Sequence, residues 1–188
     1  MMFDGPGTCV TGSNVTIQQN RFNRNWSDEL VSAPLYFGSG ALEVQNYAEA
    51  EFDHLIIRDN EIDGLLVHDY ASVTLTNATI ERTRQFVPEG GWRGPERGGG
   101  IGARVRAGGQ IEVTNFSIDN CDLAGIIIST DGQVDLHIGQ ICGHPIGVAI
   151  LPEEYDLNRL MDGVIYCDNE RNIDTRALSV PDVTTSPP

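Results

Sequence analysis

Apolar and polar residues alternate in short segments that recur at a fixed spacing along the chain. Residues 111–128 and 134–150 superimpose, because each stretch has an apolar–polar–apolar triplet followed by two further short apolar segments. The step from Ile111 to Val134 is equal to the step from Val134 to Leu157. A fixed period of roughly 20 to 50 residues built from short strands predicts a solenoid, in which each repeat stacks on the next.

The triplets divide the chain into repeats, because apolar–polar–apolar order is typical of a half-buried strand. A second strand is expected soon after each triplet, and a third strand before the next one. We therefore expect an all-β fold of about six coils, each with three short strands. The first apolar residues of the expected coils are Val15, Leu42, Val73, Ile111, Val134 and Leu157. The first three steps between them are longer than the last two, which places loop insertions in the first three coils.

Asparagines follow three of the triplets at the same distance from the first apolar position. They are Asn46, Asn77 and Asn115. Asparagine tolerates left-handed backbone in turns, and stacked amides can hydrogen-bond from one coil to the next. Asn77 and Asn115 also lie in Asn-X-Ser/Thr sequons, but we expect inward-facing members of an asparagine ladder rather than glycosylation sites.

With its three-strand coils, aliphatic stacks and asparagine turns, the chain resembles the right-handed parallel β-helix proteins of the pectate-lyase-like superfamily. The resemblance covers about residues 9–173 and includes stretches such as Asn20-Arg-Phe-Asn23. It implies a right-handed parallel β-helix, as does the right-handed preference of parallel crossovers. It also implies a saccharide-binding surface, but it indicates a fold more specifically than an activity.

The domain organisation is expected to be simple, with one β-helix domain over residues 1–178 and a Pro/Thr/Ser-rich tail or linker over residues 179–188. Residues 8–15 resemble residues 126–134, where one strand ends and the next begins. The domain is therefore expected to begin inside a coil of a longer polypeptide, whose secretion signal would lie upstream. The last repeat is degraded, and Tyr155, Leu160 and Met161 are candidates for a cap at that end.

Charge and cysteine content narrow the classes of partner. The formal net charge of −15 argues against nucleic acid, which is bound by clustered Lys and Arg, and no apolar run is long enough for membrane insertion. Cys121, Cys142 and Cys167 are about one coil apart, so a disulfide Cys121–Cys142 or Cys142–Cys167 is feasible and would suit a secreted or cell-surface protein. Buried thiols are the alternative.

Candidate site residues lie on the outward row of the first expected strand. That row would contain Thr16, Glu43, Thr74, Glu112 and Asp135, with His137 close to the last two. Glu112 and Asp135 would be neighbours, able to act as an acid/base pair or to bind calcium, although solvent-facing strands show such residues without function. Glu43, Glu112, Asp135 and Trp92, from the insertion at residues 84–100, are the ligand-binding candidates.

Two arginines are the other catalytic candidates. In lyases of the superfamily that the chain resembles, an Arg or Lys near calcium acts as the base, which would suit Arg104 or Arg106. The alternative is a salt bridge from these residues to Glu89 or Glu96. A second acidic group lies in the turns after the second strands and is either a cation site or a set of ordinary turn residues. Its members are Asp59, Glu61, Asp63, Asp119, Asp122, Asp168 and Glu170.

No complete catalytic signature is present. The polygalacturonase-type motifs are missing, and His144 in Gly143-His144-Pro145 is interpreted as a turn residue. Three hypotheses follow: a non-catalytic module of a secreted or surface bacterial protein that binds glycan or a partner; a fragment of a polysaccharide lyase or glycoside hydrolase with a cleft on the first-strand face; and an adhesin stalk. For the first, Leu66, Ile127 and Ala149 would form an outward apolar strip for docking, or would lie under residues 84–100.

Overall fold

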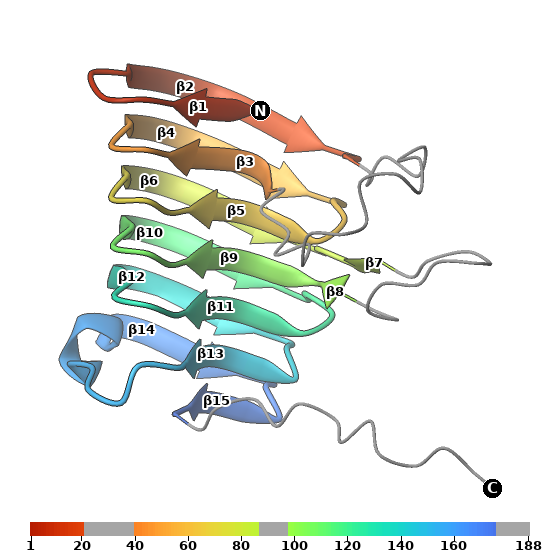
Figure 1. The fold of residues 1–188 in the computed structure, drawn as a ribbon. Helices are drawn as coiled ribbons and strands as arrows, with labels where there is room; N and C mark the ends of the chain where they lie inside the picture. Colours follow the sequence, from red (N-terminus) through yellow and green to blue (C-terminus); the bar gives the residue numbers. More distant parts are fainter. Residues whose placement is uncertain (21–39, 87–97, 176–188) are drawn as a thin grey trace, which may run out of the picture.

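The computed structural model describes residues 1–20, 40–86 and 98–175, and the chain winds there into stacked coils that form two large sheets (Figure 1). In order, sheet A consists of β1 (Met2–Asp4), β3 (Gly40–Gln45), β5 (Asp63–Val67), β9 (Ile101–Val105), β11 (Ala124–Ile128), β13 (Ile146–Ile150) and β15 (Arg171–Asp174). Sheet B consists of β14 (Asp162–Cys167), β12 (Gln133–Cys142), β10 (Gln110–Asp119), β6 (Ser72–Glu81), β4 (Glu49–Arg58) and β2 (Cys9–Gln18). Neighbouring strands pair parallel throughout both sheets.

In the described ranges, three short elements lie outside these sheets. They are β7 (Gln85–Phe86), β8 (Gly98–Gly99) and the 3-10 helix η2 (Leu157–Leu160). No helix in the described ranges is long and apolar enough to cross a membrane. The expected all-β parallel β-helix is therefore confirmed.

In β6, β10 and β12, one long strand of sheet B contains both the first and the second expected strand of its coil. A residue with positive φ sits in the middle of five strands of sheet B, at Asn14, His54, Asn77, Asn115 and Ile138. This left-handed residue shifts the in–out alternation by one position, so that Leu75 and Ala78 both face the core. The parallel pairing resumes in register on both sides of this residue, for example at Thr114 with His137 and at Phe116 with Gly139.

The strand register corrects three of the expected coil starts. Val15 pairs with Leu55 in the second half of the strand, Leu42 pairs with Leu65 in sheet A, and Leu157 lies in η2. The coil positions equivalent to Val73 are Val10 and Ala50. The alternating pattern failed here because every strand of a coil has it, so that a triplet alone does not identify its sheet.

With this register, the two long steps are the one from Val10 to Ala50 and the one from Val73 to Ile111. The step from Ala50 to Val73 is short and equals the step from Ile111 to Val134. The extra residues therefore fall between β2 and β3 and between β7 and β8, and the insertion expected in the second coil is absent.

Two-residue turns connect β3, β5, β9 and β11 of sheet A to sheet B at one corner of the coil. In each of these turns both central residues have positive φ, as at Asn46 and Tyr47, and the next amide donates back across the turn, as Ala48 N does to Gln45 O at 3.2 Å. This is the geometry of a type I′ turn. Asn46 therefore does not belong to the ladder predicted with Asn77 and Asn115.

The predicted asparagine ladder is confirmed for Asn77 and Asn115, but its predicted orientation is not. Asn115 Nδ2 donates to Asn77 Oδ1, and Asn77 Nδ2 donates to Asp53 Oδ1 at 2.8 Å. These amides lie on the outside of sheet B, with Asn115 exposed, because the left-handed residue turns its side chain away from the core. The prediction that they face inward is wrong.

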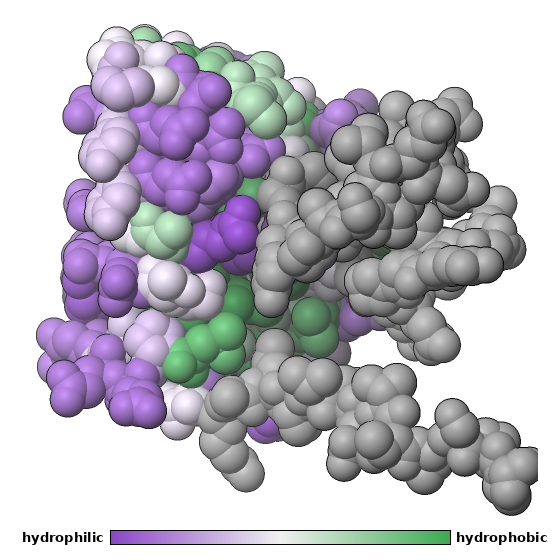
Figure 2. All heavy atoms as spheres, in the orientation of Figure 1, coloured by the Kyte–Doolittle hydropathy of each residue, from purple (hydrophilic) through white to green (hydrophobic). Residues whose placement is uncertain are grey.

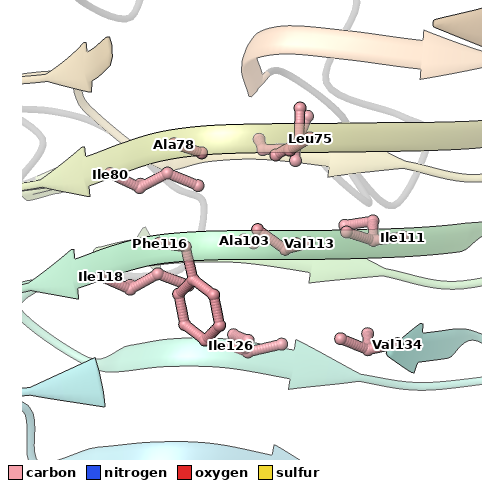
Figure 3. A pocket seen from close by; sticks show the side chains of 11 residues that line it. Leu75, Ala78, Ile80, Ala103, Ile111, Val113, Phe116, Ile118, Ile126 and Val134 are labelled. Carbon is pink, nitrogen blue, oxygen red and sulfur yellow. The ribbon is translucent and has the colours of Figure 1, made fainter. Parts of the chain in front are cut away.

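The core between the sheets is aliphatic, apart from a few aromatic rings. Phe116 fills the space above Gly139, where even a Cβ atom would lie 2.4 Å from its ring. A small apolar cavity remains beside Phe116 between β6, β9, β10 and β11 (Figure 3). Its volume of about 10 Å³ is at the lower limit for one water molecule, and without polar partners such a space stays dry.

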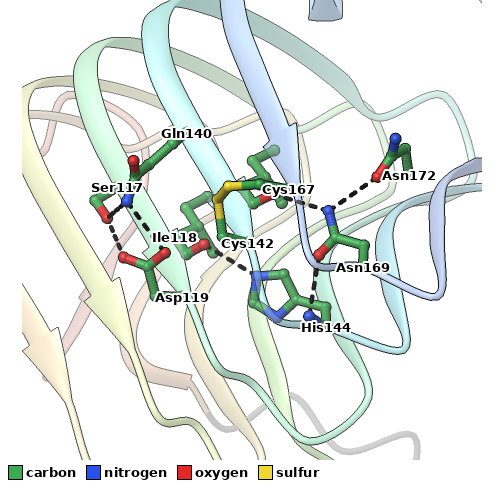
Figure 4. Close-up of a disulfide and its surroundings, with 10 residues drawn as sticks. Ser117, Ile118, Asp119, Gln140, Cys142, His144, Cys167, Asn169 and Asn172 are labelled. Atoms are coloured by element: carbon green, nitrogen blue, oxygen red, sulfur yellow. Dashed lines mark hydrogen bonds between the residues drawn. A yellow bond between two sulfur atoms is a disulfide. The ribbon is translucent and has the colours of Figure 1, made fainter.

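A column of buried polar residues lines the corner that follows sheet B, and it contains Asn60, Thr83, Cys121 and His144. Cys121 N donates to His144 Nδ1 at 3.0 Å, so Nδ1 is unprotonated and Nε2 donates to Ile118 O at 3.0 Å (Figure 4). Burial lowers the pKa of His144, in agreement with this neutral form. The interpretation of His144 as a turn residue is confirmed, and its ring also links adjacent coils.

A disulfide joins Cys142 and Cys167 on adjacent strands, with a Cα–Cα distance of 4.6 Å (Figure 4). One of the two feasible pairings is thus present, and Cys121 remains a buried thiol. Burial raises the pKa of Cys121 to about 11, so this thiol is unreactive near neutral pH.

Candidate functional site

The outer face of sheet A carries charged side chains that are buried. Along its strands Leu65 and Val67 face the core, so the outward column on this face contains Glu43, Leu66, Arg104, Ile127, Ala149 and Asp174. All buried carboxylates of the described residues lie on this face, at Glu43, Asp63 and Asp174. Buried charge is costly unless it is paired, which makes this face the first place to look for a site.

We use the name charged cluster for Glu43, Asp63, His68, Asp69, Arg104 and Arg106. These residues come from β3, β5, β9 and the turns that follow β5 and β9. Figure 2 shows a hydrophilic area over this part of the face, toward the N-terminal coils, and hydrophobic residues farther along. The cluster contains three acidic groups, two arginines and one histidine, so it is close to neutral although the chain is strongly acidic.

The most deeply buried pair in the cluster is Asp63 with Arg104. The Asp63 carboxylate is completely buried, with Oδ2 3.0 Å from Arg104 Nε and Oδ1 accepting from Arg104 Nη2 at 3.2 Å. Burial raises the pKa of Asp63 to about 6, against the opposing charges of Arg104 and Arg106. Asp63 therefore fixes the Arg104 guanidinium, whose side chain remains 28% exposed.

The second pair in the cluster is Glu43 with His68, both nearly buried. His68 Nε2 lies 3.0 Å from Glu43 Oε1, and Nδ1 lies 2.9 Å from Asp69 Oδ2. Because both ring nitrogens face carboxylate oxygens, the imidazolium form satisfies both contacts. The hydrogen bonds to Glu43 and, less strongly, to Asp69 raise the pKa of His68 against the effect of burial.

Arg106 differs from the other charged residues of the cluster because it has no acidic partner among the described residues. Its Nε is buried and has no hydrogen-bond partner among the described residues. Its charge is close enough to act on the pKa values of both Asp63 and His68. A half-buried guanidinium without a counterion, beside Arg104, is a position where an anionic or strongly polar group can bind.

The C-terminal half of the same face is apolar. Ile101, Ala124, Ile127, Ile146 and Ala149 form a hydrophobic cluster that is separate from the core. The predicted strip of Leu66, Ile127 and Ala149 is interrupted, because Arg104 lies between Leu66 and Ile127 in the register. All three residues are buried.

The outer face of sheet B holds the predicted acidic pair, and there the side chains are open to solvent or paired. Glu112 and Asp135 are directly opposite in the register, as predicted. Asp135 is engaged by Arg159, whose Nε donates to Asp135 Oδ1 at 2.7 Å, and His137 Nδ1 lies 2.8 Å from Asp162 Oδ2. A carboxylate already held by an arginine is a poor calcium ligand.

The other members predicted for this row need correction. Glu43 belongs to sheet A, and Thr16 lies in the second half of β2, so the positions that precede Thr74 are Thr11 and Glu51. A hollow opens at the N-terminal end of this face, lined by Thr11, Gly12, Glu51, Phe52, Asp53, Thr74 and Thr76. Across the described part of the chain, no three His, Cys, Asp or Glu residues are arranged to hold a metal ion.

Two members of the second acidic group, Asp59 and Asp122, are likewise paired with arginines. Arg82 Nε lies 2.7 Å from Asp59 Oδ1, and Arg84 Nη1 lies 3.0 Å from Asp122 Oδ1. These pairs link neighbouring coils and leave no cation site in the described turns. Trp92, Glu89 and Glu96 lie outside the described residues, and among the described residues Arg104 pairs with Asp63.

The structure thus brings together three of the predicted candidates, Glu43, Arg104 and Arg106. Sequence reasoning missed His68 and Asp69, and it placed Asp63 in the second acidic group instead of beside Arg104. The signal was present in the stretch Asp63-Gly-Leu-Leu-Val-His-Asp69, where the apolar run ends in a histidine and an aspartate. Placing Glu43 in the wrong sheet hid its contact with His68.

The parallel coils and the polar face on one sheet define a β-helix protein. Residues 3–140 match the family model described as "Right handed beta helix region", so the chain belongs to this family and its coils are right-handed. No curated protein matches the chain, and no solved structure does.

Proposed function

We propose that the chain is a glycan-binding module that holds an acidic saccharide on the outer face of sheet A. The observation that carries this proposal is the half-buried Arg106 without an acidic partner among the described residues, next to an Arg104 that Asp63 fixes in place. A guanidinium fork matches the two oxygens of a carboxylate, and Asp69, which is half exposed, can accept from sugar hydroxyls. A uronic-acid unit offers both kinds of group.

A secreted or surface location belongs to the same proposal. The Cys142–Cys167 disulfide supports it, because such bonds persist in oxidising compartments and are rare in reducing ones. The acidic surface is consistent with selective binding, since an anionic ligand would be repelled from most of the molecule and attracted at the two arginines.

Calorimetric titration with an oligogalacturonate, and with a neutral oligosaccharide of the same length, tests the proposal. We expect binding of the acidic ligand only, and at least tenfold weaker binding by Arg106→Gln, a loss of about 1.4 kcal/mol. Arg58→Gln is the matched control, because it removes the same charge from the outer face of sheet B. Equal affinity of the two variants for the acidic ligand would contradict the proposal. Equal affinity of the wild-type protein for the acidic and the neutral ligand would also contradict it.

An enzymatic function is the second candidate, favoured by the pKa of about 6 at Asp63 and by the His68 ring between two carboxylates. Perturbed acids and bases in one cluster are typical of acid–base sites. In this case polyuronate would be cleaved, and lyase activity would give new absorbance from unsaturated sugar ends. Binding of polyuronate without cleavage would favour the glycan-binding module. Absence of both binding and cleavage, together with end-to-end self-association, would favour the adhesin stalk.

A further inference from the structure

Two exposed tyrosines lie at the corner that joins sheet A to sheet B. Tyr47 and Tyr70 belong to the turns after β3 and β5, which lie one above the other at the left edge of the ribbon (Figure 1). The Tyr47 amide donates to Asp69 O at 3.0 Å, and the Tyr70 amide donates to Ala107 O at 3.1 Å. The two tyrosines therefore hold equivalent places in adjacent coils.

Neither tyrosine is a residue that its backbone favours. Tyr47 has a φ of 63° and Tyr70 a φ of 62°, which is the left-handed region where an aromatic residue is uncommon. The equivalent positions of the next two coils hold Gly108 and Asp131, which suit that conformation. The side chains do not serve the core either, because Tyr47 is 57% and Tyr70 is 65% exposed. Folding alone therefore does not explain these two large aromatic residues.

The two rings form one well-supported surface. Their centroids are 5.3 Å apart and their planes are 11° from parallel. Tyr70 also lies against Gly108, where a Cβ atom would come within 2.6 Å of Tyr70 Cδ1. Because neighbours already hold the rings, little side-chain freedom is left to lose when a ligand binds. The surface combines aromatic carbon with phenolic hydroxyls, and this amphipathic character favours tyrosine in binding sites.

The tyrosine pair adjoins the charged cluster. Tyr70 directly follows Asp69, and Gly108, which the Tyr70 ring contacts, is two residues after Arg106. Two residues of chain span at most about 7 Å. An oligosaccharide held at Arg106 is therefore long enough to reach the tyrosine rings.

We propose that Tyr47 and Tyr70 form a second subsite for the acidic oligosaccharide, at which they contact the pyranose ring of a sugar unit beside the one held by Arg106. A pyranose presents both C–H groups and hydroxyls, and the tyrosine pair offers aromatic carbon to the former and phenolic oxygens to the latter. The subsite rests on the proposed glycan binding at Arg106. It adds that the preferred ligand is longer than a single uronic acid.

Calorimetric titration with trigalacturonate tests the subsite. Tyr47→Asn and Tyr70→Asn should each weaken binding by about fivefold or more, because each removes one ring of the pair. Asparagine tolerates left-handed backbone, so the turns keep their conformation in both variants. Single galacturonate, titrated by NMR, should bind these variants and the wild-type protein alike, because it reaches only the arginines.

Two further variants make the result specific. Arg106→Gln should weaken the binding of both ligands, since it removes the guanidinium that holds the carboxylate. Ile138→Asn is the matched control for the tyrosine variants, because Ile138 is also large, exposed and left-handed but belongs to β12 of sheet B. It should leave both affinities unchanged.

A measurement on the wild-type protein avoids any variant. With isotope-labelled tyrosine, the ring signals of Tyr47 and Tyr70 should shift as trigalacturonate binds. Those of Tyr155 and Tyr166, whose hydroxyls donate to the backbone oxygens of Val134 and Leu160, should not shift.

The outcomes separate this subsite from the site at Arg106. If trigalacturonate binds more weakly to Arg106→Gln but equally well to both tyrosine variants, or if the signals of Tyr47 and Tyr70 do not shift, the subsite is wrong and the proposed function stands. If the wild-type protein binds neither ligand, the proposed function fails and the subsite fails with it.

Discussion

The two sheets have outer faces of opposite character, although both are built from the same alternating pattern. On sheet B the outward side chains are open to solvent, so that even Ile165 is 62% exposed. On sheet A most outward residues are buried, including Asp63 with no exposed surface and Ile127 with 5%. Strand alternation thus fixes which residues point outward, but burial and charge pairing determine which of the two faces is a candidate site.

The largest expected difference between the faces concerns their arginine–aspartate pairs. Arg104→Ala leaves the Asp63 carboxylate buried without its counterion, and we expect it to lower the free energy of unfolding by about 3 kcal/mol. Arg159→Ala leaves Asp135, which is partly exposed, in contact with water, and should cost less than about 1 kcal/mol. Urea unfolding of both variants measures the difference, and equal losses would show that the two faces are energetically alike.

A pair of isoleucines provides the same comparison without charge. Ile127→Ala should lower the free energy of unfolding by about 2 kcal/mol, because it removes buried apolar contacts on sheet A. Ile165→Ala, at an outward and exposed position of β14, should change it by less than about 0.5 kcal/mol. Similar midpoints in thermal unfolding would indicate that Ile127 is not covered in solution.

A pH-dependent effect is expected from Asp63. Its folded-state pKa is raised to about 6 from 3.8, so the folded state binds the proton more tightly than the unfolded state. Stability from this group is therefore greatest below about pH 4 and is lost as pH rises toward about 6. In unfolding experiments at several pH values, Asp63→Asn should gain stability relative to wild type as pH rises from about 4 to 7. A constant difference between the two proteins would contradict the assigned shift.

Much of the fold was predictable from the sequence because a solenoid repeats its pattern. The recurrence of one pattern at Ile111 and Val134 was sufficient to predict stacked parallel strands, and Glu112 and Asp135 were correctly placed side by side. The assignment of Leu42 and Glu43 to a first strand was wrong. Strands of both sheets show the same apolar–polar alternation, and the long segment before β3 breaks the regular repeat spacing that could have distinguished them. The site depended on that assignment, since Glu43, His68 and Arg104 meet only when β3, β5 and β9 are aligned.

The central claim is that ligand binds to the outer face of sheet A. Hydrogen exchange with and without oligogalacturonate tests it most directly, because the strands of the two sheets alternate along the chain and yield separate peptides. We predict slower exchange in β5, in β9 and in the turn after Arg106, with no change in β6, β10 and β12. Protection of β6, β10 and β12 with unchanged exchange in β5 and β9 would contradict the claim and place the ligand on sheet B, beside Glu112 and Asp135.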